Sequence, residues 1–231
     1  PIRVQTMANT DTNDIEASVS QAKRCIEAGA ELLRYTTQGT KEAENLGIIH
    51  NKLQSEGYTT PLVADIHFNP HVAETAAKLV EKIRINPGNF VSSKEGEYSE
   101  KEWAEEINKI REKLFPLLDI CKQHNTCVRI GVNHGSLSKR IVSKYGNTPL
   151  GLAKSCMEFI DLCEEAEFYN LILSIKASNT RVMVYAVRML VEMMEKSGKN
   201  YPLHLGVTEA GSDTEGRIKS ASGIGTLLSE G

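Results

Sequence analysis

Short β-type runs alternate with amphipathic helical stretches along this chain, and that alternation constrains the fold more than any other feature. Several runs end in a polar residue, at residues 63–67, 83–86, 128–133, 173–176 and 205–209. A repeated β-then-α order predicts parallel strands covered by helices. Folds of this kind place their chemistry at the carboxyl ends of the strands. The polar residues that close the runs are therefore the candidate functional site.

The number of runs indicates the architecture. We expect strands at residues 2–7, 31–36, 62–66, 82–86, 127–132, 170–176 and 203–208, with a last helix at 216–228. The chain has 231 residues, close to the roughly 250 of a typical TIM-type α/β barrel. Seven strands are one fewer than a closed barrel needs. The sequence therefore predicts an α/β fold, a TIM (β/α)8-type barrel truncated before its eighth strand, in a single domain over residues 1–231.

Composition excludes several classes of function. The net charge is −3 and the basic residues are scattered, so a nucleic-acid partner is disfavoured. No apolar run approaches the ~18 residues of a membrane span. The five cysteines include no Cys-x-x-Cys pair, so we expect reduced core thiols and no metal site. The stripe formed by Val182, Tyr185, Met189 and Met193 on one predicted helix is expected to face the protein core.

Cationic side chains gather near the predicted strand ends. They are Arg34, Arg84, Arg129 and Lys176, and the evident acids beside them are Asp65 and Glu209. Arginine forks match phosphate oxygens, and buried guanidiniums without a counter-ion are costly. This surplus predicts an anionic ligand with more than one phosphate charge, aided by the glycine-bearing segment 211–216. The alternative is that the arginines make structural salt bridges to Asp65, Glu31 or helix ends.

Three further residues are candidates for proton transfer or phosphate contact. Glu209 closes the seventh run and is the strongest candidate for general acid or base catalysis, although a strand-end carboxylate can also be a plain salt-bridge partner. His67 shares a strand face with Asp65, and His134 follows Asn133. Either imidazole could donate a proton or a hydrogen bond to phosphate, and either could be structural.

Seven motifs together resemble one known family. They read VQTMANT at 4–10, PLVADIH at 61–67, RINPGN at 84–89, RIGVNHGSL at 129–137, SIKAS at 174–178, HLGVTEAG at 204–211 and IKSA at 218–221. In this order they resemble the barrel motifs of the 4-hydroxy-3-methylbut-2-en-1-yl diphosphate synthase family over nearly the whole chain. The acidic stretch after Asn89 and the NHGS form of the fifth motif are similar to the longer, three-domain version.

The resemblance implies a reductive ring opening of 2-C-methyl-D-erythritol 2,4-cyclodiphosphate in non-mevalonate isoprenoid synthesis. It implies an oxidoreductase that delivers two electrons through a [4Fe-4S] cluster. By motif, the diphosphate and its ring would be held by Arg34, Arg84, Asn86, Arg129, Asn133 and Lys176. Asp65 and His67 would support these residues, and Glu209 would donate a proton or orient the reacting carbon.

The chain also departs from the family pattern. In the family, three cysteines and a glutamate of a separate C-terminal domain hold the cluster, and none of the five cysteines here lies in that motif. The eighth strand and the inserted domain are also missing. We therefore expect that this chain binds no cofactor and is inactive alone. For the full-length enzyme, the resemblance implies ferredoxin or flavodoxin as electron donor, a homodimer, and the bacterial cytoplasm.

Two other functions remain open on the sequence. One is a dihydropteroate-synthase-like barrel, because a fold alone does not fix chemistry. The motifs at 129–135 and 208–211 argue against it. The other is a non-catalytic domain that binds a phosphorylated ligand. The presence or absence of a cysteine-bearing domain in the same gene would separate this possibility from the synthase.

Overall fold

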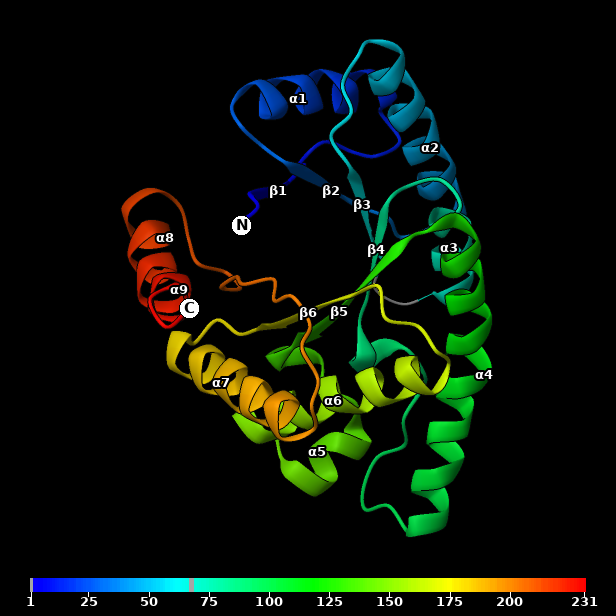
Figure 1. The fold of residues 1–231 in the computed structure, drawn as a ribbon, viewed down its shortest axis with the longest axis vertical. Coiled ribbons are helices and arrows are strands. Elements are labelled where there is room, and N and C mark those ends of the chain that lie inside the picture. The colour runs from blue at the N-terminus through cyan, green and yellow to red at the C-terminus, as the bar shows by residue number, and fades with distance from the viewer. Residues whose placement is uncertain (1, 67–68) are drawn as a thin grey trace. The chain divides into compact units, whose positions relative to one another are not determined.

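A computed structural model of the chain describes residues 2–66 and 69–231 (Figure 1). The described residues form two compact units. Apart from residues 1, 67 and 68, which lie outside the described ranges, the first consists of Pro1–Ile85 and Lys113–Arg129, and the second of Asn86–Glu112 and Ile130–Gly231. Helix α4 and strand β5 contribute residues to both. None of the helices in the described part of the chain has the length and hydropathy that a membrane span requires.

The first unit is built on parallel strands in sequence order. Its elements are β1 (Gln5–Met7), α1 (Ile15–Glu27), β2 (Leu32–Thr36), α2 (Thr40–Ser55), β3 (Leu62–Asp65), α3 (Pro70–Ala77), β4 (Lys82–Ile85), the end of α4 (Glu100–His124) and the start of β5 (Cys127–Asn133). Every residue of β3 and β4 is buried, as expected for parallel strands covered on both faces. Helices α1, α2 and α3 lie on one side of these strands (Figure 1).

Local chemistry explains where these helices begin. The Asp14 carboxylate accepts the amide hydrogen of Ala17 and caps α1, and the Asn69 side chain caps α3 by accepting from His71. Pro70 occupies the first turn of α3, where its missing N–H costs nothing. The strands β1 to β4 and the helices between them therefore form as the sequence predicts.

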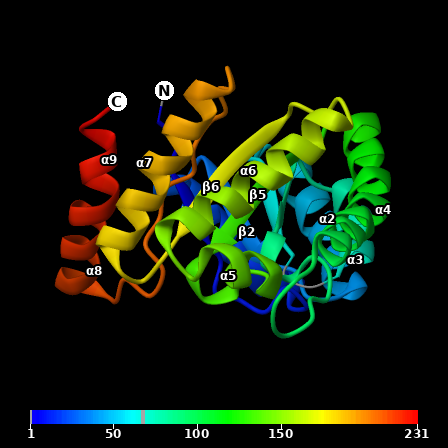
Figure 2. The same cartoon turned by 90° about the horizontal axis from the view of Figure 1, so that it is seen from below.

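The second unit continues the alternation. Its elements are η1 (Pro87–Asn89), the start of α4, the end of β5, η2 (His134–Ser136), α5 (Lys139–Tyr145), α6 (Pro149–Glu165), β6 (Leu171–Lys176), α7 (Thr180–Lys196), α8 (Asp213–Ser220), the π-helix η3 (Ala221–Gly225) and α9 (Thr226–Leu228). Strand β6 neighbours β5. Helix α6 packs against α7 and β6, and α7 lies beside the α8–α9 segment (Figure 2).

The α/β architecture is confirmed, but the expected seventh strand is not found in the described residues. The segment 203–208 makes only an isolated parallel bridge, between Leu173 and Leu203. The His204 amide donates to the Leu173 carbonyl at 2.7 Å and the Thr208 amide to the Ala177 carbonyl at 3.1 Å. Within the described chain, this segment has a strand neighbour on one side only. Its backbone follows β6 without forming a continuous ladder.

Two helical expectations also need correction. The buried face of α7 consists of Met183, Val184, Ala186, Val187, Leu190 and Met194, whereas Tyr185 and Met189 of the expected stripe are exposed.

The final helix is interrupted by the π-helix η3. A Cβ on Gly223 would lie 2.8 Å from both Met183 Cε and Val207 Cγ2, so the backbone there packs closely against its neighbours. The close packing at Gly223 thus coincides with the change from α-helix to π-helix between α8 and α9.

A buried ion network holds the long segment between η1 and α4. Arg140 Nε donates to Glu106 Oε1 at 2.9 Å, and its NH1 donates to Glu158 Oε2 at 2.7 Å. The guanidinium lies over the Trp103 ring at 4.2 Å from the centroid. Ser93 and Tyr98 donate to the two oxygens of Glu106, each at 3.1 Å. Glu106 therefore joins the acidic stretch 91–99 to a buried arginine.

The turns η1 and η2 meet so closely that a glycine is required. A Cβ built on Gly88 would lie 1.4 Å from the backbone carbonyl oxygen of Ser136. Asn86 Nδ2 donates to Ser136 Oγ at 3.0 Å across the same junction. The turns η1 and η2, which follow β4 and β5, are thereby fixed to each other within the second unit.

We expect Gly88→Ala to lower the free energy of unfolding by about 1–3 kcal/mol, because the new methyl group overlaps backbone that cannot rotate away. Urea denaturation measures the change. Gly135→Ala is the matched control, since a Cβ there meets nothing within 4 Å. Its expected effect is within about 0.5 kcal/mol. Equal stability of the two variants would contradict the described junction.

Candidate functional site

Three arginines surround one carboxylate in the first unit. Asp65 Oδ2 lies 3.3 Å from Arg34 Nε, and Asp65 Oδ1 lies 3.3 Å from Arg84 NH1 and 4.0 Å from Arg129 NH2. The Asp65 side chain is 2% exposed, and those of Arg84 and Arg129 are also buried. One carboxylate cannot neutralise three guanidiniums. This arginine–aspartate cluster therefore carries surplus positive charge.

Strand register explains why these residues meet. Thr36 pairs with Asp65, and Asp65 pairs with Arg84, so these residues form one row across β2, β3 and β4. Arg34 lies two residues before Thr36 and therefore shares its face. The Arg34 guanidinium also donates to the Met7 sulfur at 2.8 Å. The sequence-predicted residues Arg34, Asp65, Arg84 and Arg129 are thus brought together.

The electrostatics of the cluster favour a bound anion. Burial lowers the pKa of the Arg84 guanidinium, and the Asp65 charge opposes this. Burial, followed by the charges of Arg34 and Arg84, lowers the pKa of Arg129. A guanidinium nevertheless keeps its proton at neutral pH. Three like charges in a buried setting are relieved when an anion with several oxygens binds between them.

The structural alternative, in which salt bridges consume the arginines, accounts for only part of the cluster. Glu31 pairs with Arg3 instead, and it also accepts the Val4 amide hydrogen at 2.8 Å. Asp65 does hold the arginines, as that alternative expected. The single negative charge of Asp65 still leaves a surplus of positive charge. The salt-bridge interpretation therefore explains how the arginines are held, and the anion-site interpretation explains the charge that remains.

Sequence reasoning missed Lys82. It lies two residues before Arg84 on β4, so it faces the same side, and it is 5% exposed. The same alternation that identified Arg84 and Asn86 would have identified it. An interior lysine is rare enough to be informative, because long charged side chains are almost never fully buried without a partner.

Asn86, Asn133 and His134 belong to the second unit. Asn86 is buried, and its Oδ1 accepts the Gly88 amide hydrogen at 3.2 Å while its Nδ2 donates to Ser136. Asn133 ends β5. His134 Nε2 lies 3.2 Å from the Asn147 carbonyl oxygen, so that nitrogen carries the hydrogen. The other ring nitrogen of His134 is then the one that could accept or donate at a ligand.

Lys176 and Glu209 also lie in the second unit. Lys176 ends β6, and its chain passes over Gly206, where an added Cβ would lie 2.8 Å from Lys176 Cε and 2.9 Å from Nζ. Glu209 is exposed and has a φ of 52°, a left-handed conformation uncommon for a glutamate. Among the described residues, none forms a hydrogen bond or ion pair with the Glu209 carboxylate. The plain salt-bridge alternative thus has no support in the described part of the chain.

The predicted site residues therefore fall into two sets. Arg34, Asp65, Arg84 and Arg129 are held in the first unit, and Asn86, Asn133, His134, Lys176 and Glu209 in the second. His67 lies outside the described residues. The roles assigned to all of these residues stay predictions.

The cysteines of this chain do not fit an iron–sulfur cluster. In the described ranges, no group of three or more His, Cys, Asp or Glu could hold a metal ion. Cluster ligands are thiolates. Burial raises the pKa of Cys121 to about 12 and that of Cys127 to about 11. Buried thiols of this kind keep their protons at neutral pH, which is typical of structural cysteines.

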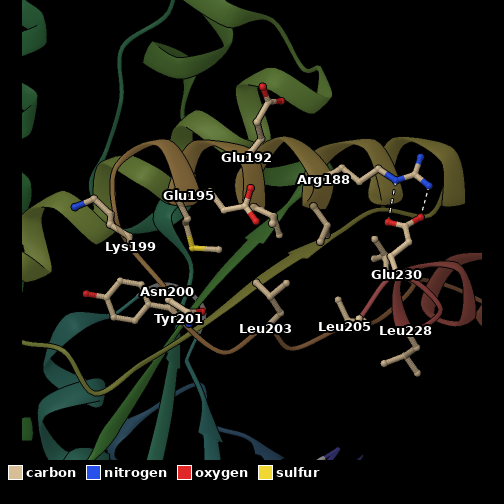
Figure 3. Close-up of a pocket in the computed structure, with 15 residues that line it drawn as sticks. Arg188, Glu192, Glu195, Lys199, Asn200, Tyr201, Leu203, Leu205, Leu228 and Glu230 are labelled. Carbon is tan, nitrogen blue, oxygen red and sulfur yellow. Dashed lines mark hydrogen bonds and ion pairs between the residues drawn. The ribbon is translucent and has the colours of Figure 1, made fainter.

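A cavity of about 770 Å³ lies elsewhere in the second unit, between α7, residues 199–205 and α9 (Figure 3). Leu203, Leu205 and Leu228 line it, and at its rim Arg188 Nε donates to Glu230 at 3.1 Å. None of the predicted site residues lines this cavity. Its carboxylates outnumber its cations, so it is not suited to a phosphate ligand.

Comparison with protein families identifies the chain. The family model described as the GcpE TIM-barrel domain matches residues 1–231. Curated relatives named 4-hydroxy-3-methylbut-2-en-1-yl diphosphate synthase (flavodoxin) include those of Parabacteroides distasonis, 60% identical, Bacteroides fragilis, 58%, and Akkermansia muciniphila, 50%. Each match covers 100% of this chain and 38%, 38% and 40% of the relative. The chain thus spans about two fifths of the length of these relatives.

Solved structures share the fold with little sequence identity. A deoxyribose phosphate aldolase from Aeropyrum pernix matches with a TM-score of 0.54 and 12% identity, covering 96% of this chain and 80% of that one. A 3-keto-D-glucoside 4-epimerase from E. coli matches with a TM-score of 0.52 and 11% identity, covering 98% of both chains. At such low identity these likenesses concern the fold alone.

We expect Asp65→Asn to lower the free energy of unfolding by about 3–5 kcal/mol, because it leaves the buried guanidiniums without their carboxylate. Urea denaturation measures this loss. Added inorganic diphosphate should restore part of it, since an anion can replace the missing charge. Glu31→Gln, which removes an acid from a more exposed ion pair, should leave stability nearly unchanged. The cluster as described is contradicted if Asp65→Asn is as stable as this control.

Proposed function

Because the chain belongs to the GcpE TIM-barrel domain family, we propose that it is the substrate-binding barrel of a 4-hydroxy-3-methylbut-2-en-1-yl diphosphate synthase. The proposed substrate is 2-C-methyl-D-erythritol 2,4-cyclodiphosphate, which the whole enzyme reduces to 4-hydroxy-3-methylbut-2-enyl diphosphate in non-mevalonate isoprenoid synthesis. Residues 1–231 act in this proposal as one domain, whose task is to hold the substrate.

The arginine–aspartate cluster is the observation that carries the proposal. A cyclic diphosphate brings negative charge on two phosphoryl groups, and Arg34, Arg84 and Arg129 offer three guanidiniums against one carboxylate. Guanidinium forks bind phosphoryl oxygens in pairs, which fixes the orientation of the ligand as well as its position. A substrate held in a fixed orientation reacts faster, because the cost of orienting it is met by binding.

The second set of residues has complementary proposed roles. Lys176 adds a cation, while Asn86, Asn133 and His134 offer hydrogen bonds to the diphosphate and ring. Glu209 is the proposed proton donor, or the group that orients the reacting carbon. Its exposed position and strained backbone are typical of a residue placed for chemistry rather than for packing. His67 is proposed, from the sequence, to support the arginines with Asp65.

Reduction itself is proposed for the whole enzyme. In this proposal the electrons enter through a cluster held elsewhere in the whole enzyme, since no group of the described residues could hold a metal ion. The names of the curated relatives specify flavodoxin, and we accordingly propose flavodoxin as the electron donor. A homodimer in the bacterial cytoplasm remains part of the proposal for the full-length protein.

The two other functions carry less weight. Membership of the GcpE TIM-barrel domain family counts against a dihydropteroate-synthase-like enzyme. A non-catalytic domain that binds a phosphorylated ligand would use the same cluster, but it would leave the exposed, strained Glu209 without a role. Preferential binding of a pterin would reverse this ranking.

Calorimetric titration with 2-C-methyl-D-erythritol 2,4-cyclodiphosphate at fixed salt tests the proposal. Arg84→Ala and Lys176→Ala should each weaken binding about tenfold to a hundredfold, the effect of removing one hydrogen bond to a charged group. Arg111→Ala is the control, because Arg111 makes a surface ion pair with Glu165 at 2.9 Å. It should bind like the wild type. A folded wild-type protein that does not bind, or equal affinities for all four proteins, would refute the assigned substrate site.

A further inference from the structure

Lys82 occupies the same strand face as the arginine–aspartate cluster, one layer below it. Val63 pairs with Lys82 on one side and with Arg34 on the other, so these three residues form the row that precedes the Thr36–Asp65–Arg84 row. The Cys127 amide donates to the Glu81 carbonyl at 2.9 Å, which places the start of β5 beside the start of β4. The Lys82 side chain therefore extends from an interior row.

The amine of Lys82 has no acid to pair with among the described residues. The residue is 5% exposed, and within the described ranges no hydrogen bond or ion pair to the Lys82 amine is found. Asp65, the carboxylate of the adjacent row, already serves the guanidiniums. A lysine that only contributes its methylene chain to packing usually extends its amine to water. The Lys82 residue is 5% exposed, so nearly all of its side chain lies out of water in this interior row.

We propose that Lys82 is a fourth cation of the anion site, and that binding of a phosphate ligand to the cluster is coupled to proton uptake at its amine. This inference rests on the proposed function, because it assumes that the arginine–aspartate cluster binds a diphosphate. It adds a residue that the family motifs did not indicate, and it makes the affinity of the site depend on pH.

The charges that face Lys82 explain the coupling. Burial is the main cause that lowers the pKa of Lys82 to about 8, and the Arg129 and Arg34 guanidiniums lower it further, while Cys127 opposes them. Arg84 faces the same side from β4, and Asp65 does so from β3. The Cys127 thiol, with a pKa raised to about 11 by burial, stays neutral near pH 8. Lys82 is thus the group of this set that titrates there.

The direction of the effect follows from these charges. A bound diphosphate offsets the guanidiniums, so the amine regains its proton and its pKa rises above about 8 in the complex. The contribution of Lys82 to affinity is then fully present below the pKa of the free protein. It declines as the pH rises from that pKa toward the higher pKa of the complex.

Calorimetry with inorganic diphosphate, in pairs of buffers that differ in protonation enthalpy, measures proton uptake directly. At about pH 8 the wild type should take up about half a proton more than Lys82→Met, because half of its amines are neutral before binding. Protonation of the ligand itself is common to both proteins and cancels in the difference. Lys78→Met, which removes an exposed lysine, is the control and should match the wild type.

A second variant guards against misfolding of Lys82→Met. Lys82→Arg keeps a permanent charge, so it should bind diphosphate without the additional proton uptake. The inference is overturned if the wild type binds and Lys82→Met or Lys82→Arg takes up as many protons as the wild type. A wild type that does not bind diphosphate, or whose binding is unaffected by Arg84→Ala, overturns the proposed function and this inference together.

Discussion

The carboxylate of Asp65 is the interaction on which the first unit depends. It lies within 4.0 Å of three guanidiniums, in a setting where each of those charges would be costly alone. Its position is fixed by a register that aligns Thr36, Asp65 and Arg84, and a slip of one residue would turn each of these side chains to the opposite face. The surplus charge that burial disfavours is the same charge to which the proposed function assigns the diphosphate. Stability and function are therefore balanced at one residue.

The sequence predicted the parts of this molecule that depend on short-range periodicity. Strand residues alternate faces, so Arg84 and Asp65 could be assigned to the interior from their places in short runs that end in polar residues. Parallel order followed from the β/α alternation, and it brought Arg34 and Arg129 into the same cluster. Six of the seven expected strands are present in the described chain, with ends shifted by up to three residues. Family membership confirms the barrel class.

Other features depend on contacts between distant segments, which periodicity cannot show. Glycine is required at Gly88 because the backbone of Ser136, 48 residues later, leaves no room for a side chain. The expected seventh strand was read from its own apolar pattern, whereas a ladder also needs partners along its length. On α7 the helical spacing of Met183, Val187, Leu190 and Met194 does identify the buried face, and the stripe chosen from the sequence lay beside it. Lys82 was overlooked because a lysine in a strand is normally assigned to solvent.

The stacking of Arg140 on Trp103 has a spectroscopic consequence. The chain contains one tryptophan, and it belongs to the second unit, with the Lys144 ammonium 4.9 Å from its ring centroid as well. Its fluorescence therefore responds to the environment of that unit, whereas far-ultraviolet circular dichroism follows the helices of both. Denaturation curves recorded by the two signals coincide only if the units unfold together. A single tryptophan thus makes the cooperativity between the two units an observable quantity.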